Sequence, residues 1–156
     1  MIAKNRIPAE YKKLIRDPIE NVTFKMNEQN IYEWEFILNG PKDSPYEGGI
    51  YKGNIKYPTE YPCKPPEVTF TSKLFHPNVY SNGKICISIL HEGTDVTGYE
   101  NQLERWSPIN NIAVVFKSIL VLLNEPNIYS AANVDAATLW RDNKNMYNKK
   151  IKDDMK

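Results

Sequence analysis

The chain has little cysteine, little histidine, almost no net charge and no long hydrophobic run. It holds two cysteines and two histidines in 156 residues, and its formal net charge is +1. Such a balance gives no general attraction toward nucleic acid or an anionic membrane, so any electrostatic recognition must come from local patches. No run approaches the roughly 18 apolar residues that span a bilayer, so we expect no direct membrane insertion.

The two cysteines, Cys63 and Cys86, could pair in principle. The amino terminus carries no signal segment, and this absence favours a reducing, cytoplasmic compartment in which free or catalytic thiols are usual. The cysteines and the histidines, His76 and His91, lack paired ligand spacing, so no metal site is predicted. The remaining composition, 41% hydrophobic and 25% charged, is typical of one globular domain, which we expect to cover residues 1–156.

Residues 1–16 predict an amphipathic basic helix. Four apolar side chains recur there at helical spacing: Ile7, Tyr11, Leu14 and Ile15. A proline inside a helix removes a hydrogen-bond donor and clashes with the preceding turn, so we expect the regular helix to begin near Pro8. The basic side chains of this helix form either a solvated face or a docking surface.

The segments that follow predict strands and then helices. Residues 22–26, 32–38 and 51–57 alternate apolar and polar side chains, and residues 68–70 supply a short fourth strand after a proline-rich run. Short connections between sequential strands predict an antiparallel meander.

Three helices are predicted after the strands. Asn110 or Asn111 can cap a helix so apolar that we expect it to be central and buried. A further helix should run from a cap at Asn133 or Asp135 through Trp140, and residues 144–156 should form a polar final helix. The prediction is therefore an α+β fold: a four-stranded antiparallel meander with an amino-terminal helix and carboxyl-terminal helices.

The stretch from Lys73 to Leu90 is the predicted chemical centre. A polar loop there, held by Pro77 and by the turn at Asn82-Gly83, delivers Cys86 into an alternation of isoleucines. The alternation would seat the thiol against a core while one side stays open. Cys86 is then either a nucleophile or a packing residue, since cysteine is among the most often buried residues.

Two polar residues precede Cys86, and each allows two interpretations. The Asn78 carboxamide can donate a hydrogen bond to a developing oxyanion without titrating, or it can brace the turn. A histidine near a cysteine suggests a protease-like dyad, but the position of His76 before Pro77 in a rigid turn better suits a structural hydrogen bond.

These residues resemble the signature of the ubiquitin-conjugating enzymes. Three motifs occur in that family's order over nearly the whole chain: Tyr57-Pro58-Thr59-Glu60-Tyr61-Pro62-Cys63-Lys64-Pro65-Pro66, then His76-Pro77-Asn78 with Cys86 eight residues beyond it, then Arg105-Trp106-Ser107-Pro108. The insertion between Cys86 and Trp106, with residues 133–137 and 140–141, is most similar to the acidic-loop branch linked to degradation at the endoplasmic reticulum. The fold that the resemblance implies agrees with the predicted one.

The resemblance implies an acyl transfer through Cys86. The thiol would accept the carboxyl terminus of ubiquitin as a thioester from the ubiquitin-activating enzyme and pass it to a lysine amine with a ubiquitin ligase of the RING type. The family assigns catalysis to an asparagine at the position of Asn78, with His76 and Pro77 supporting the oxyanion or the turn. No cofactor is expected on this chain, because ATP is used by the activating enzyme.

The segment after Cys86 carries four carboxylates among glycines: Glu92, Asp95, Glu100 and Glu104. It is either a solvated surface loop or a gate that attracts the incoming lysine, because clustered carboxylates concentrate cations. Attraction and chemistry oppose each other here, since carboxylates favour the ammonium form and the amine must be deprotonated to attack. Ser130 stands where many relatives have an acidic residue, which puts a carboxylate base at that flank in doubt.

Docking residues are also implied by the resemblance alone. The first helix would bind the activating enzyme through Lys4, Arg6, Lys12 and Lys13. That helix and two loops would bind the ligase, the loops through Pro62, Cys63, Lys64, Ser107, Pro108 and Ile109. Cys63 replaces the larger apolar residue usual in the first loop, which leaves ligase preference open. A cytoplasmic location is expected, with recruitment to the cytosolic face of the endoplasmic reticulum by a partner.

Two other function classes compete with this interpretation. A non-catalytic binding module would match family variants that lack the cysteine, and the presence of Cys86 argues against it. A cysteine hydrolase would need a histidine base beside Cys86 and would cleave its substrate without an activating partner.

Overall fold

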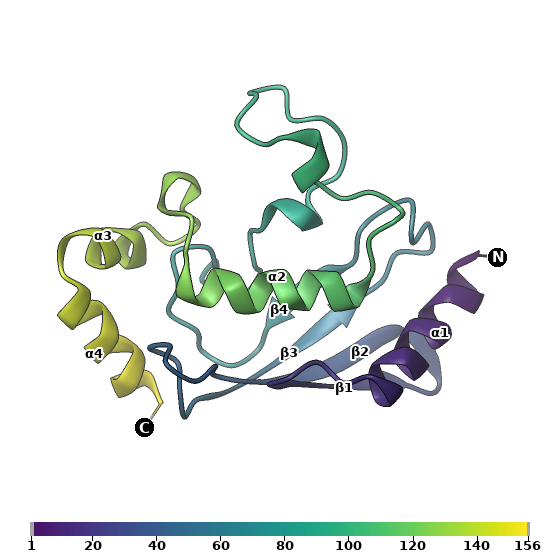
Figure 1. Cartoon of the computed structure of the whole chain (residues 1–156), viewed down its shortest axis with the longest axis horizontal. Helices are drawn as coiled ribbons and strands as arrows, with labels where there is room; N and C mark the ends of the chain where they lie inside the picture. Colours follow the sequence, from purple (N-terminus) through teal and green to yellow (C-terminus); the bar gives the residue numbers. More distant parts are fainter. Residues whose placement is uncertain (1, 156) are drawn as a thin grey trace.

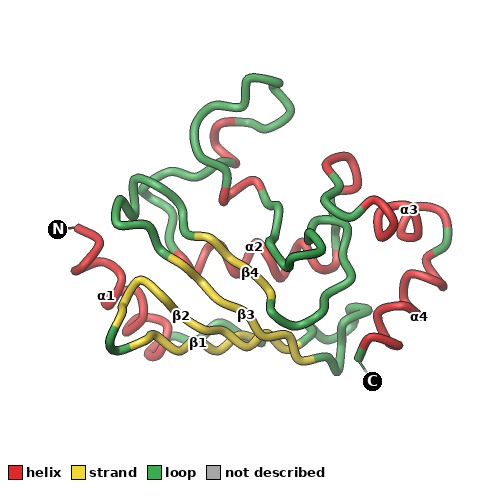
Figure 2. Tube along the Cα trace, turned by 180° about the vertical axis from the view of Figure 1, so that it is seen from behind, coloured by secondary structure: helices red, strands yellow, loops and turns green. Residues whose placement is uncertain are grey.

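Four strands form one antiparallel sheet in the order β1-β2-β3-β4. The computed structural model describes residues 2–155, so Met1 and Lys156, which the predicted domain and terminal helices include, lie outside it. The strands are β1 (Val22–Asn27), β2 (Asn30–Asn39), β3 (Ile50–Lys56) and β4 (Glu67–Phe70). Within the sheet each strand pairs with the strands next to it in the sequence, which confirms the predicted meander (Figures 1 and 2).

The alternation read from the sequence describes how the sheet is buried. In β2, Trp34, Phe36 and Leu38 point into the core, while the alternating positions Glu33, Glu35 and Ile37 are exposed. The helix α2 (Ile112–Asn124) crosses the apolar face of the sheet (Figure 1). Its Phe116 ring meets Phe24 and Phe36 edge-on, each at 4.9 Å between ring centroids, a favoured arrangement for aromatic pairs.

Helix α1 (Ile2–Arg16) contains Pro8 in its interior, so the prediction that regular helix begins near Pro8 is wrong. The turn before Pro8 is held by packing, because the side chains of Ala3 and Ile7 are buried in the core. The Arg6 guanidinium adds hydrogen bonds to the carbonyl oxygens of Pro108 and Asn110. These contacts offset the hydrogen bond that proline removes.

The helices after the sheet begin where their caps were predicted. The Asn111 side chain accepts from the Val114 N–H at the start of α2, and Asn133 does the same for the Ala136 N–H at the start of α3 (Val134–Asp142). Helix α4 (Lys144–Asp154) follows directly. Within residues 2–155, no helix is long and apolar enough to cross a membrane.

Helix α2 is central but buried on one side only. Its core side consists of Ile112, Val115, Phe116, Ile119 and Leu123. On the opposite side Val114 and Val121 are exposed, and this side helps to line a hollow beside Cys86.

Candidate active site

The segment that carries Cys86 is pinned to the edge of the sheet. Lys84 forms an isolated antiparallel bridge with Thr69 of β4, and the Gly83 carbonyl accepts from the Phe70 N–H at 2.8 Å. Gly83 has a φ of +89°, and a Cβ there would lie 1.8 Å from the Phe70 carbonyl oxygen. Only glycine fits this turn, as Asn82-Gly83 predicted. The N–H of Cys86 then donates to the Asn78 carbonyl at 2.7 Å, which fixes the backbone at the thiol.

Cys86 is half-buried and lies where two hollows meet. One hollow runs toward the proline-rich segment and includes Lys64 and Lys84 in its wall. The other runs toward the outer side of α2 and the acidic loop. Burial raises the pKa of the Cys86 thiol, and the negative charge of Glu100 raises it further, against a lowering by a hydrogen bond with Tyr80. The thiol is thus accessible from two sides and tends to be protonated when free.

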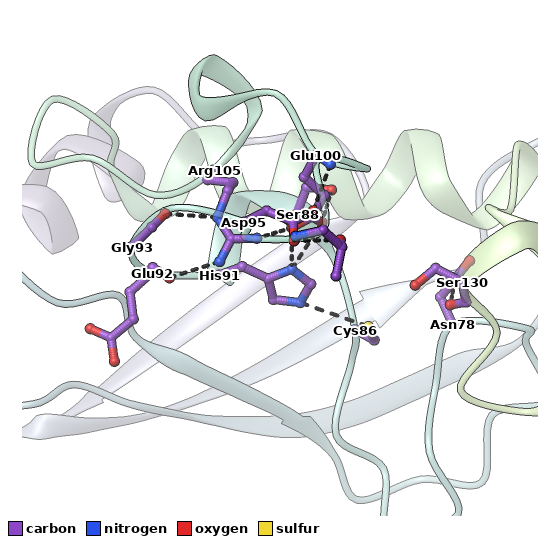
Figure 3. A network of polar contacts seen from close by, with 11 residues as sticks. Asn78, Cys86, Ser88, His91, Glu92, Gly93, Asp95, Glu100, Arg105 and Ser130 are labelled. Atoms are coloured by element: carbon purple, nitrogen blue, oxygen red, sulfur yellow. Dashed lines mark hydrogen bonds and ion pairs between the residues drawn. The ribbon is translucent and has the colours of Figure 1, made fainter.

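His91 lies on one flank of Cys86 and faces its sulfur (Figure 3). The distance from His91 Nε2 to Cys86 Sγ is 3.7 Å. The other ring nitrogen, Nδ1, lies 2.9 Å from both carboxylate oxygens of Glu100. The order thiol, imidazole, carboxylate is the order in which a nucleophile, a base and an orienting group are arranged in cysteine and serine hydrolases.

Glu100 is the centre of this network. Besides His91, it accepts hydrogen bonds from the Ser88 hydroxyl and from Arg105 Nη1. Arg105 also donates from Nε to the Gly93 carbonyl at 2.8 Å and from Nη2 to the Glu92 carbonyl at 2.7 Å. Burial favours a higher pKa for Glu100, but the Ser88 and His91 hydrogen bonds, with the charges of His91 and Arg105, outweigh it and lower the pKa. The carboxylate is therefore ionised at neutral pH.

His76 has a structural position. Its ring is fully buried, Nε2 lies 2.7 Å from the Leu122 carbonyl, and Nδ1 accepts from the Asn78 N–H at 2.9 Å. Burial lowers the pKa of His76 to about 4, although the bond to Leu122 opposes this. Both nitrogens of the neutral ring therefore form hydrogen bonds within the fold. This agrees with the structural role predicted for His76, and not with a role in a protease-like dyad.

Asn78 lies on the other flank of Cys86 (Figure 3). Its Nδ2 donates to the carbonyls of Asn127 and Ser130, at 2.8 and 3.2 Å, and its Oδ1 accepts from the Asn127 N–H at 2.9 Å. These contacts give Asn78 the bracing role, because they fasten the segment after α2 beside the cysteine. Asn78 also lines the same hollow as Cys86, so an oxyanion role stays a prediction.

The four carboxylates of the acidic loop have different surroundings. Asp95 binds its own loop, accepting from the Thr97 hydroxyl, the Thr97 N–H and the Glu100 N–H, and these bonds lower its pKa to about 2. Glu100 is occupied with His91 and Arg105. Glu92 and Glu104 are exposed, Glu92 beside the first hollow and Glu104 beside the second. Of the four, Glu92 and Glu104 are therefore the two whose carboxylates are open to solvent at the hollows.

The predicted docking residues fall into exposed and anchored groups. Lys4, Lys12 and Lys13 are exposed on α1. Arg6 is instead anchored, with its side chain 25% exposed and bound to Glu10 at 2.9 Å. It therefore serves the fold more than a docking surface.

The two predicted ligase loops lie side by side. Trp106 Nε1 donates to the Pro62 carbonyl at 2.8 Å, and Arg6 binds the Pro108 carbonyl. Pro62 is buried, after a cis peptide bond with Tyr61, so its ring offers no surface to a partner. The other members are more accessible: Cys63, Lys64, Pro108 and Ile109 are exposed, and Ser107 is half-buried.

The sequence interpretation missed His91, Ser88 and Arg105 as members of the site. In the sequence, His91 stands out only as a possible metal ligand, and Arg105 only as part of a motif. The available signal was a histidine five residues after the cysteine, with a carboxylate and an arginine in the loop that follows. A loop of this length has no periodicity, so the sequence could not show that it folds back on His91.

Comparisons with known proteins agree on one family. A sequence model of the family described as "Ubiquitin-conjugating enzyme" matches residues 6–155. The chain is 44% identical over 149 residues to human "Ubiquitin-conjugating enzyme E2 G2", covering 94% of this chain and 90% of the relative. It is 50% identical over 133 residues to "Ubiquitin-conjugating enzyme E2" of African swine fever virus, covering 85% of this chain and 60% of that protein. With "Ubiquitin-conjugating enzyme E2 14" of Arabidopsis thaliana it shares 44% identity over 144 residues.

Proposed function

Because the chain belongs to the ubiquitin-conjugating enzyme family, whose members are cysteine-dependent transferases, we propose that Cys86 is the residue that carries ubiquitin as a thioester. One observation supports this most directly: Cys86 is a half-buried thiol that lines two hollows, whereas Cys63 is exposed and lines neither of them. Two openings suit a group that holds an acyl donor on one side and receives an amine on the other.

Transfer would proceed by two exchanges at the Cys86 sulfur. The thiol first displaces the activating enzyme from the carboxyl terminus of ubiquitin. A lysine amine then attacks the thioester carbonyl, and Cys86 leaves as the thiolate. Asn78, at the wall of the second hollow, would face the oxyanion that develops when the amine adds to the thioester carbonyl, and it also holds the segment after α2 in place.

Ubiquitin, an activating enzyme and a ligase are the partners that the family implies. We propose a ligase of the RING type, docked on α1 and on the exposed residues Cys63, Lys64, Pro108 and Ile109. The activating enzyme would dock on α1 through Lys4, Lys12 and Lys13. A role in degradation at the endoplasmic reticulum is supported by the acidic-loop insertion and by the similarity to "Ubiquitin-conjugating enzyme E2 G2". Recruitment there would then depend on a partner.

The experiment that tests this proposal is a charging reaction. The protein is incubated with activating enzyme, ubiquitin and ATP, and the products are separated with and without a thiol reductant. The native protein should give an adduct that the reductant removes, and Cys86→Ser should give one that resists it, because an oxygen ester is not reduced. Cys86→Ala should give none. An adduct that persists in Cys86→Ala but is lost in Cys63→Ala would show that the nucleophile is Cys63 and would contradict the proposal.

The acidic loop is proposed to act on the acceptor lysine, and its exposed and internal carboxylates can now be tested apart. Glu104→Gln should slow discharge to free lysine about threefold at low salt, and the difference should shrink as salt is raised, because exposed charges are screened over about 8 Å at physiological ionic strength. Asp95→Asn removes bonds within the loop, so its effect should not depend on salt. If Glu104→Gln discharged at the wild-type rate at every salt concentration, Glu104 would be only a solvated surface residue with no role in discharge.

A further inference from the structure

His91 presents one particular nitrogen to Cys86. Its Nδ1 faces an ionised carboxylate, which can only accept hydrogen bonds, so in the neutral ring the proton lies on Nδ1 and points at Glu100. Nε2 then carries the lone pair, which is directed at Cys86 Sγ at 3.7 Å and is released from the S–H once the sulfur is acylated (Figure 3). The ring is 33% exposed at its side chain and also lines both hollows, so it can be reached from the side on which an amine arrives.

The ring is held in this orientation from behind. The Glu100 carboxylate is itself fixed by the Ser88 hydroxyl, the Arg105 guanidinium and the N–H of its own residue, which donates from the main chain to Asp95 at 2.8 Å. A carboxylate that orients an imidazole in this way fixes the tautomer that can accept a proton at Nε2. The raised pKa of the Cys86 thiol argues against a stable thiolate–imidazolium pair, so the His91 ring does not already hold the proton of the thiol.

We propose that His91 is a further catalytic residue of ubiquitin transfer, which accepts at Nε2 the proton released by the attacking lysine amine, and that Glu100 is its positioning residue. This inference rests on the proposed function. The amine nitrogen forms a bond to the thioester carbon, the carbon–sulfur bond breaks, and the electron pair stays on Cys86 as thiolate. The proton moves from the nitrogen to His91, which then returns it to the thiolate or to solvent. The products are an amide and a free thiol, so the step balances without another reactant.

The geometry meets the requirement for such a base. The thioester carbon is bonded directly to Sγ, so an amine that attacks it comes within direct reach of Nε2 or reaches it through one water. His76 cannot replace His91, since its ring is buried and both its nitrogens are bonded. The acidic loop thereby gains a second task. It attracts the lysine as an ammonium ion, which loses one proton to solvent to become the free amine, and it also carries His91, which accepts the proton that the amine releases when it attacks.

The test follows discharge of molecules that already carry the thioester. After charging, the activating enzyme is stopped and an alkoxyamine is added, which is uncharged near neutral pH and so does not add its own titration to the profile. His91→Gln should discharge about 10²-fold more slowly than wild type near neutral pH. The wild-type rate should rise with pH through an inflection, because only an unprotonated ring nitrogen can accept the proton, and His91→Gln should lack this inflection.

The pH profile is read against the ionisable groups around His91. Cys86 and Glu100 contact it directly, and Arg105 lies behind Glu100. Others line the two hollows: Lys56, Tyr57, Lys64, Glu67, Tyr80, Lys84, Glu92 and Glu104. The inflection is therefore assigned by its loss in His91→Gln and not by its position.

Two further variants separate a chemical role from a structural one. Added imidazole should raise the discharge rate of His91→Ala at least tenfold, because it can occupy the vacated space. It should give no such gain in Asn78→Ala. Glu100→Gln should slow discharge about tenfold, because a less firmly held ring presents Nε2 less often.

Distinct results would overturn the inference or the proposed function beneath it. A wild-type protein that forms no thioester would remove the proposed function itself. Discharge by His91→Gln at the wild-type rate, or slowed equally at every pH without relief of His91→Ala by imidazole, would overturn the role of His91. Loss of hydrolysis in water but not of aminolysis in His91→Gln would also overturn it, and would favour a hydrolase instead.

Discussion

His76 and His91 are the two histidines of the chain, and their surroundings give them opposite chemistry. His76 is buried with both ring nitrogens bonded to the backbone, so it stays neutral and rigid. His91 is partly exposed, with one nitrogen held by a carboxylate and the other facing the thiol. His76, which belongs to a sequence motif, therefore supports the fold. His91, which lies outside every motif, faces the Cys86 thiol.

The buried state of His76 predicts acid-sensitive stability. Its folded pKa of about 4 lies below the ordinary value near 6.5. The unfolded chain therefore takes up a proton first as the pH falls, and the stability present above about pH 6.5 is lost progressively down to about pH 4. Between pH 7 and pH 5 this loss should be about 2 kcal/mol in the free energy of unfolding. Urea unfolding at both pH values, for wild type and His76→Gln, should show a smaller loss in the variant, and an equal loss would contradict the assignment.

Asn78→Ala tests how bracing and catalysis divide at one side chain. The substitution leaves the Asn127 N–H and two carbonyls without their partner, which should lower the free energy of unfolding by about 2 kcal/mol. If Asn78 also serves the oxyanion, discharge to lysine should slow by about 10² at a temperature where the variant remains folded. The exposed Asn148→Ala on α4 is the control, with no change expected in either. If the variant were destabilised but discharged at the wild-type rate, Asn78 would have only the bracing role.

Among the secondary structure elements, α1 departs most from its sequence. Pro8 lies in the interior of the helix, yet the turn that precedes it is regular, because Ala3 and Ile7 pack into the core and Arg6 reaches over to the segment before α2. Tertiary contacts here outweigh a local preference.

Pro8→Ala should accordingly stabilise the protein. The alanine restores an N–H for the helix and removes the clash with the preceding turn, so we expect the free energy of unfolding to rise by about 1 to 3 kcal/mol. Thermal and urea unfolding measure it, with the exposed Ala9→Gly expected to move stability the other way. A loss of stability in Pro8→Ala would mean that the packing of the proline ring stabilises the protein by more than its missing hydrogen-bond donor destabilises it.

The sheet and the caps were predictable from the sequence because each depends on local patterns. Alternation in β2 and the capping residues Asn111 and Asn133 act over a few positions, and the structure confirms them. The site was only half predictable: the turn at Gly83 and the half-open seat of Cys86 follow from local chemistry. The approach of His91 to Cys86 depends on where residues 92–105 return, and Arg105 decides this through contacts that no periodicity records.

Across the whole molecule, one partly buried carboxylate joins three distant segments. Glu10 of α1 accepts from Arg6, from the Tyr61 hydroxyl at 2.6 Å and from the Ile112 N–H at 2.9 Å. The helix, the proline-rich segment and the start of α2 therefore meet at one side chain. The two proposed ligase loops are built on this junction.

Glu10→Ala should destabilise the protein as a whole. Arg6 would lose its ion pair, and a hydroxyl and a backbone amide would lose their acceptor, so we expect a loss of about 3 kcal/mol in the free energy of unfolding. Urea unfolding measures this loss, with the exposed Glu20→Ala as a control of the same chemistry. If both variants lost equally little, the junction would not contribute as a unit.

The guanidinium of Arg105 closes residues 92–105 into a ring, since it binds the carbonyls of Glu92 and Gly93 and the carboxylate of Glu100. The tip of that ring, around residues 96–99, is almost fully exposed at Val96 and Tyr99. Doubling the length of a flexible loop costs only about 0.6 kcal/mol. The tip is therefore a place where a peptide tag or a reporter dye could be inserted near Cys86 without displacing His91, and the loop can change length in evolution while the contacts of Arg105 stay the same.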